Sequence, residues 1–397
     1  MARRMLDQLQ PQPADALLAL IKLHDSDPRE DKIDLGVGVY RTNTGATPVF
    51  GAIKAAEQRL VNEQDSKAYL GPEGDMGFVA ALTPWIFGPD FATARIQGMQ
   101  TPGGTGAVRL AAALARKAGA ERVHMGVPSW PNHQQIFTDL GLETVPFAHA
   151  TADGSADLGA VLKAIEGSSA QDAVLLHGCC HNPTGIDYSA ADWDAIAAAL
   201  ARSKVLPIID LAYHGLGQGM DEDVAGMRAV LAAVPQALIA YSCDKNFGLY
   251  RDRVGALYFM TAESPLLETI ASNANALARA AWSMPPDHGA AAVRLILDDE
   301  GLTAQWQDEL TTMRERMRRV RERLAAADNT VPGLNLAAIG QGNGLFAMLP
   351  LSPAQIKALR EDHAVYMAGS GRINIAGLTE ANTPRFIEAL GAVAAAG

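Results

Sequence analysis

Polar side chains follow three apolar, strand-like runs of this 397-residue sequence, at the point where each run ends. The segments that follow the runs are His181–Gly185 (HNPTG), Asp210–Tyr213 (DLAY) and Ser242–Gly248 (SCDKNFG). Ligands of open parallel sheets bind beyond the carboxyl ends of the strands, so we expect these segments to meet in one site. In that site Lys245 would supply an amine nucleophile and Asp210 a carboxylate.

The segment Thr101–Gly106 (TPGGTG) opens a predicted helix upstream of these strands. Backbone N–H groups at a helix start bind anions, and glycines let a phosphate approach closely. Arg253 offers a guanidinium that can bind the same phosphate through two hydrogen bonds. A phosphate cradle, a lysine and an acid predict pyridoxal 5'-phosphate, because the lysine forms a Schiff base and the acid holds the ring nitrogen protonated. The glycines match neither the G-x-G-x-x-G dinucleotide motif nor a P-loop.

Alternating strands and helices must position these residues. Helical patterns cover 105–118 and 190–201, and strand-like runs cover 122–127, 173–176, 205–209, 237–241 and 254–260. This alternation predicts an α/β fold, with a large domain whose mostly parallel sheet is flanked by helices.

A long helix is predicted over 302–327, because apolar residues recur there at steps of three and four. The stripe consists of Leu302, Trp306, Leu310, Met313, Met317, Val320 and Leu324, which we expect to be core residues. The basic run 314–323 is expected to be a solvated face of the same helix.

The chain is expected to form two domains joined by this helix. Strand and helix signals after it, at 344–348, 353–362 and 372–375, predict a smaller α+β domain. We assign 44–309 to a large cofactor-binding domain, and 1–43 with 310–397 to a small domain. The strand-like stretch 33–40 contains two glycines, which indicate that its backbone closely approaches another segment.

Charge and cysteine content argue against several classes of protein. The 44 acidic and 33 basic residues give a formal net charge of -11, which argues against a nucleic-acid partner. We find no run of about 18 apolar residues and no secretory signal, so no membrane association is expected. Three cysteines make no disulfide framework and suit a reducing compartment, so the protein is predicted to be cytoplasmic.

Four residues of types that can bind a metal lie close together in the sequence: His177, Cys179, Cys180 and His181. Adjacent cysteines at a strand end should point to opposite faces, and the spacing is not C-x-x-C. We therefore predict no metal there.

Several segments together resemble the class I, fold-type I pyridoxal-phosphate aminotransferases, the aspartate and aromatic amino-acid aminotransferase family. The resemblance runs over nearly the whole chain, from Leu35–Tyr40 (LGVGVY) to Gly371–Gly377 (GRINIAG). Its most specific stretches are Pro128–His133 (PSWPNH), His177–Gly185 (HGCCHNPTG) and Lys245–Tyr250 (KNFGLY).

The resemblance implies a role for each matching residue that would bind the cofactor. Lys245 would be the Schiff-base lysine and proton carrier, Asp210 would pair with the ring nitrogen, and Tyr213 would bind the phenolic oxygen with Asn182. Trp130 would stack on the ring. The phosphate ligands would be Gly104, Thr105, Ser242 and Arg253, with Tyr69 contributed by the other subunit.

The resemblance also implies how substrate is held. Arg372 would bind the α-carboxylate, with Gly38, Asn182 and Trp130 nearby. Arg279 would come from the other subunit to meet a side-chain carboxylate, so the resemblance implies a homodimer with shared active sites.

Four positions depart from the family pattern. Asp244 replaces the usual serine before the lysine, and Ala68, Ala281 and Met284 stand where aspartate-specific members tend to carry asparagine. The last three make the substrate side of the pocket less polar. A carboxylate facing the phosphate would repel it, so we expect Asp244 to turn away and to find a donor elsewhere.

The predicted activity is transfer of an amino group from aspartate or aromatic amino acids to 2-oxoglutarate, by a ping-pong mechanism. Two alternatives stay open: a pyridoxal-phosphate β-eliminating lyase or decarboxylase of the same fold, and a nucleotide-binding regulatory protein.

Overall fold

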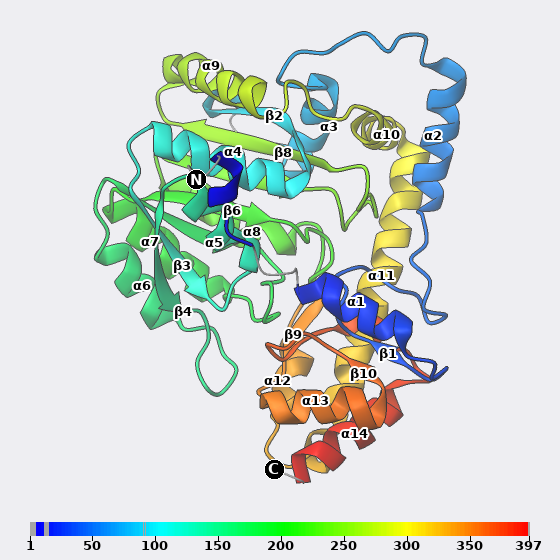
Figure 1. Ribbon diagram of the computed structural model, residues 1–397. Helices are drawn as coiled ribbons and strands as arrows, with labels where there is room; N and C mark the ends of the chain where they lie inside the picture. The colour runs from blue at the N-terminus through cyan, green and yellow to red at the C-terminus, as the bar shows by residue number, and fades with distance from the viewer. Residues whose placement is uncertain (1–4, 12–15, 90, 92, 396–397) are drawn as a thin grey trace.

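A seven-stranded sheet lies at the centre of the larger part of the computed structural model, which describes residues 5–11, 16–89, 91 and 93–395 (Figure 1). In spatial order its strands are β2 (Ile96–Pro102), β8 (Val254–Thr261), β7 (Gln236–Ser242), β6 (Leu206–Leu211), β5 (Asp172–His177), β3 (Arg122–Val127) and β4 (Glu143–Ala148). Only β8 runs antiparallel to its neighbours in this sheet. The predicted α/β fold is confirmed.

Helices cover both faces of this sheet, as the apolar strands require. One face packs on α4 (Gly103–Lys117), α5 (Pro131–Asp139) and α9 (Ser264–Ala281). The other face packs on α3 (Met76–Phe87), α6 (Leu158–Glu166), α7 (Ala190–Arg202), α8 (Glu222–Ala233) and α10 (His288–Leu297). Successive strand residues alternate between the two cores: Ile208 and Leu238 lie in the first, Ile209 and Ile239 in the second.

The long helix α11 (Glu300–Ala326) runs from the large sheet to a smaller group of elements (Figure 1). Its predicted apolar stripe is buried throughout. Trp306 donates its ring N–H to the carbonyl of Asn246 at 2.7 Å and stacks on Phe247 at 4.5 Å. The helix therefore packs directly against the segment that carries Lys245.

The smaller group contains two short sheets covered by helices. Its strands are β1 (Ile33–Asp34), β10 (Val365–Tyr366), β9 (Phe346–Met348) and β11 (Arg372–Asn374), and its helices are α1 (Ala16–Ser26), α12 (Leu336–Gln341), α13 (Pro353–His363) and α14 (Thr383–Ala395). The remaining elements are α2 (Gly51–Glu63) and short 3-10 helices at Met5–Gln8, Thr93–Arg95, Asp328–Thr330 and Ile375–Gly377. Across the described residues, we find no helix with the length and apolarity that a bilayer crossing requires.

The strand predicted over 33–40 is only partly formed, because β1 ends at Asp34. Beyond it, the carbonyls of Val37 and Val39 accept hydrogen bonds from the Asn374 side-chain amide, at 2.6 and 2.7 Å, in place of a ladder. The close approach inferred from the glycines is confirmed, since a Cβ on Gly38 would come within 2.7 Å of Phe346.

The prediction that 314–323 forms a solvated face is wrong for two arginines. Arg316 and Arg321 are 5% and 3% exposed. Arg316 donates to the carbonyls of Ala376 and Leu378, and Arg321 donates to four carbonyls, those of Ile339, Asn343, Gly344 and Phe346. Both cations therefore donate to carbonyls of the irregular chain in the smaller group.

Candidate active site

The carboxyl edge of the sheet brings together the predicted chemical groups. Asp210 ends β6 between two neighbours, in register with His177 of β5 and Ala240 of β7. Asn182 follows β5, and Lys245 follows β7. The three segments that sequence reasoning singled out are thus adjacent strand ends of one sheet.

A chain of hydrogen bonds supports Asp210 from behind. His133 Nε2 lies 2.9 Å from Asp210 Oδ2, and His133 Nδ1 lies 3.0 Å from Ser129 Oγ. Ser129 Oγ is also 3.0 Å from His177 Nε2. With an ionised Asp210, His133 Nε2–H donates to the carboxylate, Nδ1 accepts from Ser129, and Ser129 accepts from His177.

The electrostatics of this chain keep Asp210 negative. Burial on its own raises the pKa of Asp210, but interactions led by the hydrogen bond from His133 outweigh it, so the net pKa lies below the usual value. Burial lowers the pKa of His177 to about 3, so this ring is neutral and can donate from Nε2. The site therefore presents a buried carboxylate that can hold a proton on a ring nitrogen placed against it.

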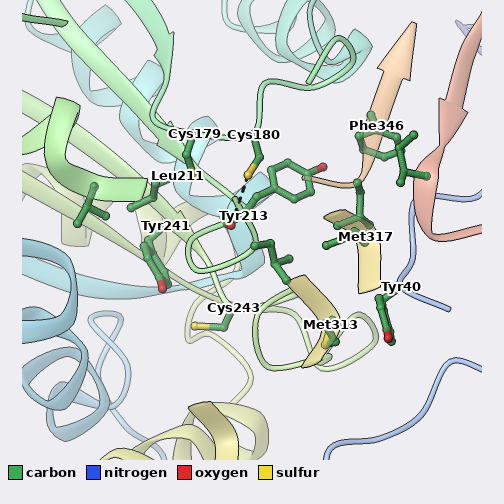
Figure 2. Close-up of a cluster of buried hydrophobic side chains, with 14 of the residues drawn as sticks. Tyr40, Cys179, Cys180, Leu211, Tyr213, Tyr241, Cys243, Met313, Met317 and Phe346 are labelled. Carbon is green, nitrogen blue, oxygen red and sulfur yellow. Dashed lines mark hydrogen bonds between the residues drawn. The ribbon is translucent and has the colours of Figure 1, made fainter. Parts of the chain in front are cut away.

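The amine of Lys245 lies over the ring of Tyr213, with Nζ 5.3 Å from the ring centroid. Burial lowers the pKa of this lysine, although the charges of Asp244 and Asp210 partly restore it. Asn182 Nδ2 donates to the Tyr213 hydroxyl at 3.3 Å, and Asn182 Oδ1 is buried without a partner among the described residues. Figure 2 shows Cys180 and Phe346 close to Tyr213. A desolvated lysine beside a phenol and an amide suits covalent binding of an aldehyde cofactor.

The start of α4 lies directly against Ser242 and Arg253, and together they form a cradle. A Cβ on Gly104 would come within 2.7 Å of the Ser242 side chain, and one on Gly103 within 2.6 Å of the Arg253 guanidinium. The first N–H groups of the helix, a hydroxyl and a guanidinium thus converge where a side chain would leave no space. These residues fit the phosphate of pyridoxal 5'-phosphate. Thr105 lies in the same first turn.

Arg253 reaches this cradle with strained backbone. Its φ of 57° lies in the left-handed region, which a non-glycine residue adopts only when its surroundings impose it. Its NH1 group donates to Asp244 Oδ2 at 2.5 Å and to the Tyr250 carbonyl at 3.0 Å. The donor expected for Asp244 is present, but it is the cation of the cradle itself rather than a group elsewhere.

Arg372 and Gly38 meet on the ring of Phe346. The Arg372 guanidinium lies 4.4 Å from the ring centroid and donates to the Gly36 carbonyl at 2.9 Å. Burial lowers the pKa of Arg372, and its Nε is buried without a partner among the described residues. The ring of Phe346 also packs against Tyr213, with centroids 6.1 Å apart, so Arg372 lies beside the cofactor residues.

Two predicted site residues lie outside this cluster in the single chain. Tyr69 is 95% exposed, and Arg279 is exposed, with NH1 donating to Ser283 Oγ at 2.7 Å. Their segments touch, because the Leu70 amide lies 3.1 Å from the Met284 sulfur. Trp130 does join the cluster, since its ring packs edge-on against His133 at 5.0 Å.

The prediction that the side chains of Cys179 and Cys180 point to opposite faces is wrong. The sulfurs of Cys179 and Cys180 lie within 4.8 Å of each other and of an Asp223 oxygen, because Cys180 has a left-handed φ of 50°. Both Asp223 oxygens, however, already accept backbone N–H groups of residues 215, 217, 218 and 219. Burial also raises the pKa of Cys180 to about 12. The absence of a metal stays a prediction.

Sequence reasoning missed the supporting chain of His133, Ser129 and His177. A signal for the first two was available, because Ser129 and His133 lie in the predicted motif that follows the strand 122–127 and therefore at the same sheet edge. The order of their hydrogen bonds depends on side-chain directions, which the sequence does not carry.

The sequence and the structure of this chain are similar to those of known proteins over nearly their whole length. The profile of the family "Aminotransferase class I and II" matches residues 30–390. A tyrosine aminotransferase of Rhizobium meliloti is 50% identical and covers 95% of this chain and 97% of its own length. An aspartate aminotransferase of Escherichia coli is 40% identical, covering 98% and 100%. The crystal structure of an aromatic-amino-acid aminotransferase from Burkholderia pseudomallei, covalently bound to pyridoxal phosphate, superposes with a TM-score of 0.95 at 31% identity, covering 98% and 100%.

Proposed function

This chain belongs to the class I and II aminotransferases, and from that premise we propose that it moves the amino group of aspartate and of aromatic amino acids to 2-oxoglutarate. It is a pyridoxal-phosphate-dependent amino-acid transaminase rather than a lyase or a nucleotide-binding regulator. The observation that carries the proposal is the meeting of Lys245, Asp210 and the α4 cradle at one sheet edge. Relatives named for tyrosine and for aspartate support both donor classes.

We assign the cofactor residues as the family resemblance implies. When bound, the cofactor supplies an electron sink for the substrate's α-carbon. Lys245 holds it covalently and then moves a proton at that carbon, while Asp210 holds the ring nitrogen protonated. The other proposed contacts are Trp130 against the ring, Asn182 and Tyr213 at the phenolic oxygen, and Gly104, Thr105, Ser242 and Arg253 at the phosphate.

Substrate would be held by its carboxylates. The half-buried Arg372, with an unpartnered Nε, suits the α-carboxylate. Gly38 has no side chain, and the ring of Phe346 occupies the space that one would take. Arg279 would meet the second carboxylate of aspartate or 2-oxoglutarate. Ala68, Ala281 and Met284 leave that end of the pocket apolar enough for an aromatic ring.

We further propose a homodimer in which each chain completes the site of the other. Support comes from Tyr69 and Arg279, which are both exposed and lie on touching segments. They would reach the phosphate and the distal carboxylate of the second copy.

We also propose a division into a large domain, 44–309, and a small domain, 1–43 with 310–397. A cytoplasmic location is likewise proposed, supported by three buried, unpaired cysteines.

Asp210→Ala is expected to slow removal of the α-proton by about two orders of magnitude or more, as for loss of one preorganised charge. The ring nitrogen would lose its proton, and His133 would lose its acceptor. Single-turnover kinetics with an α-deuterated amino acid would measure this step. Asp172→Ala is the matched control, because it removes another buried carboxylate, at the far end of β5, and should leave the step unchanged. Equal rates for wild-type and Asp210→Ala would show that Asp210 does not act on the ring nitrogen.

The substrate proposal is tested by kcat/KM for aspartate, phenylalanine and tyrosine, with 2-oxoglutarate as acceptor. We expect measurable turnover with all three, because an added apolar contact discriminates only modestly between donors. Each keto acid should appear with one equivalent of glutamate. Turnover confined to aspartate would refute dual specificity, and release of ammonia in place of glutamate would indicate elimination.

A further inference from the structure

Asp244 places a carboxylate against Arg253, the cation of the phosphate cradle. Its side chain is 6% exposed, and its backbone N–H donates to Ser242 Oγ at 3.2 Å. Oδ2 accepts from Arg253 NH1, and Oδ1 is buried with no partner among the described residues. A buried carboxylate oxygen without a donor is costly, so a donor is expected to reach it in the working enzyme.

The charges around Asp244 leave the cradle close to neutral. Arg253 is the cation of the cradle, and Asp244 cancels it. The charges of Asp244 and Asp210 both raise the pKa of Lys245, but this lysine is the proposed covalent partner of the cofactor's aldehyde and does not act as a free cation. Cys243 and Tyr250 also face Asp244, and burial, as the main cause, raises the pKa of each, so both stay neutral and add no charge. Among the described groups around the cradle, the partial charge at the start of α4 is then what remains to attract an anion.

Two acceptors hold one end of the Arg253 guanidinium. Its NH1 group donates both to Asp244 Oδ2 and to the Tyr250 carbonyl. The opposite edge of the guanidinium faces Gly103. Arg253 is thus held between Asp244 and the helix start, and a bound phosphate must lie close to both.

We propose that Asp244 neutralises Arg253, so that this chain binds its cofactor phosphate comparatively weakly and in the singly protonated form. The phosphate hydroxyl then donates a hydrogen bond to Asp244 Oδ1. The inference rests on the proposed cradle and adds a residue that sets cofactor retention. Free phosphate esters lose their second proton near about pH 6. Binding the protonated form therefore takes up a proton, and affinity falls as pH rises above that value.

The test is equilibrium dialysis of the holoenzyme and of Asp244→Ser, with released pyridoxal 5'-phosphate measured between about pH 6.5 and 8.5. The wild-type dissociation constant should rise by roughly 30- to 100-fold over this range, and that of Asp244→Ser by roughly threefold or less. At the upper pH, Asp244→Ser should bind the cofactor about 10- to 100-fold more tightly. The charge of Asp244 also raises the pKa of Lys245, so the covalent bond does not have the same pH dependence in the two proteins, and the phosphate itself has to be observed.

A second readout reports the phosphate directly. Over this pH range, the 31P chemical shift of bound cofactor should stay at the monoanion position in the wild type and at the dianion position in Asp244→Ser. Asp252→Ser is the matched control, because it removes a carboxylate next to Arg253 in the chain and leaves the Asp244–Arg253 ion pair intact. It should behave as wild type in both measurements.

Two outcomes would overturn the inference separately. Weaker cofactor binding by Asp244→Ser, or equal pH slopes in the two proteins, would show that Asp244 serves to position Arg253 and that the phosphate binds as the dianion. If Arg253→Ala retains the cofactor as tightly as the wild type, the proposed cradle itself is misplaced, whatever Asp244 does.

Discussion

Lys245→Ala should fold and take up the cofactor without bonding it, while transamination falls by several orders of magnitude. The variant lacks both the covalent attachment and the group that moves the proton at the substrate carbon. Among the described residues, the groups found beside Lys245 are the ring of Tyr213 and the charges of Asp244, Asp210 and Arg253, none of which is an amine that could replace it. The lowered pKa of Lys245 supports the same role, since burial favours the uncharged, nucleophilic amine.

Stopped-flow absorbance of the two half-reactions would measure this loss. Lys204→Ala, which changes an exposed lysine just before β6, is the matched control and should turn over normally. Borohydride should trap the cofactor on wild-type protein and fail to trap it on Lys245→Ala. If the variant kept near-normal turnover, another nucleophile would have to carry the cofactor, and the assignment of the site would be wrong.

Arg279→Ala should separate the two classes of substrate. A guanidinium can make two charge-assisted hydrogen bonds to a second carboxylate, each contributing about 1.5–3 kcal/mol. Their loss should cost roughly 3–5 kcal/mol with aspartate, a factor of about 10² to 10⁴ in kcat/KM. Phenylalanine has no second carboxylate, so its half-reaction should lose far less.

The half-reactions must be followed separately, because 2-oxoglutarate is itself dicarboxylic and would mask the difference in the full cycle. Arg318→Ala, an exposed arginine on α11 paired with Glu322, is the control. If aspartate and phenylalanine suffer equally from Arg279→Ala, this arginine does not bind the side-chain carboxylate. The result would leave the amino-transfer chemistry of Lys245 untouched.

The residues that follow strands could be predicted because the rule that places them is topological. Asp210, Asn182 and Lys245 each follow an apolar run, so the order of strands brings them together regardless of side-chain detail. The direction of β8 was not predictable in this way, since an apolar run of eight residues reads alike in either direction.

What the sequence did not predict depends on contacts between distant segments. The stretch after β1 alternates like a strand, but Asn374 takes its carbonyls. Arg316 and Arg321 lie three and four residues after Met313 and Met317, so helical spacing already placed them beside the buried stripe. Apart from the carbonyl of Thr42, their carbonyl acceptors come from 339–378, and no local pattern predicts them.

Helix α11 fixes a length as well as a contact. Trp306 is bonded to the segment of Lys245, and Arg321 is bonded to the carbonyl of Phe346, the residue beneath Arg372. Fifteen residues separate these two anchors, which at 1.5 Å per residue is about 22 Å of helix. The helix thus sets the distance between the amine proposed to carry the cofactor and the cation proposed for the substrate carboxylate. One inserted residue would turn one anchor by about 100° relative to the other. The number of residues between Trp306 and Arg321 therefore determines how the two chemical groups are placed.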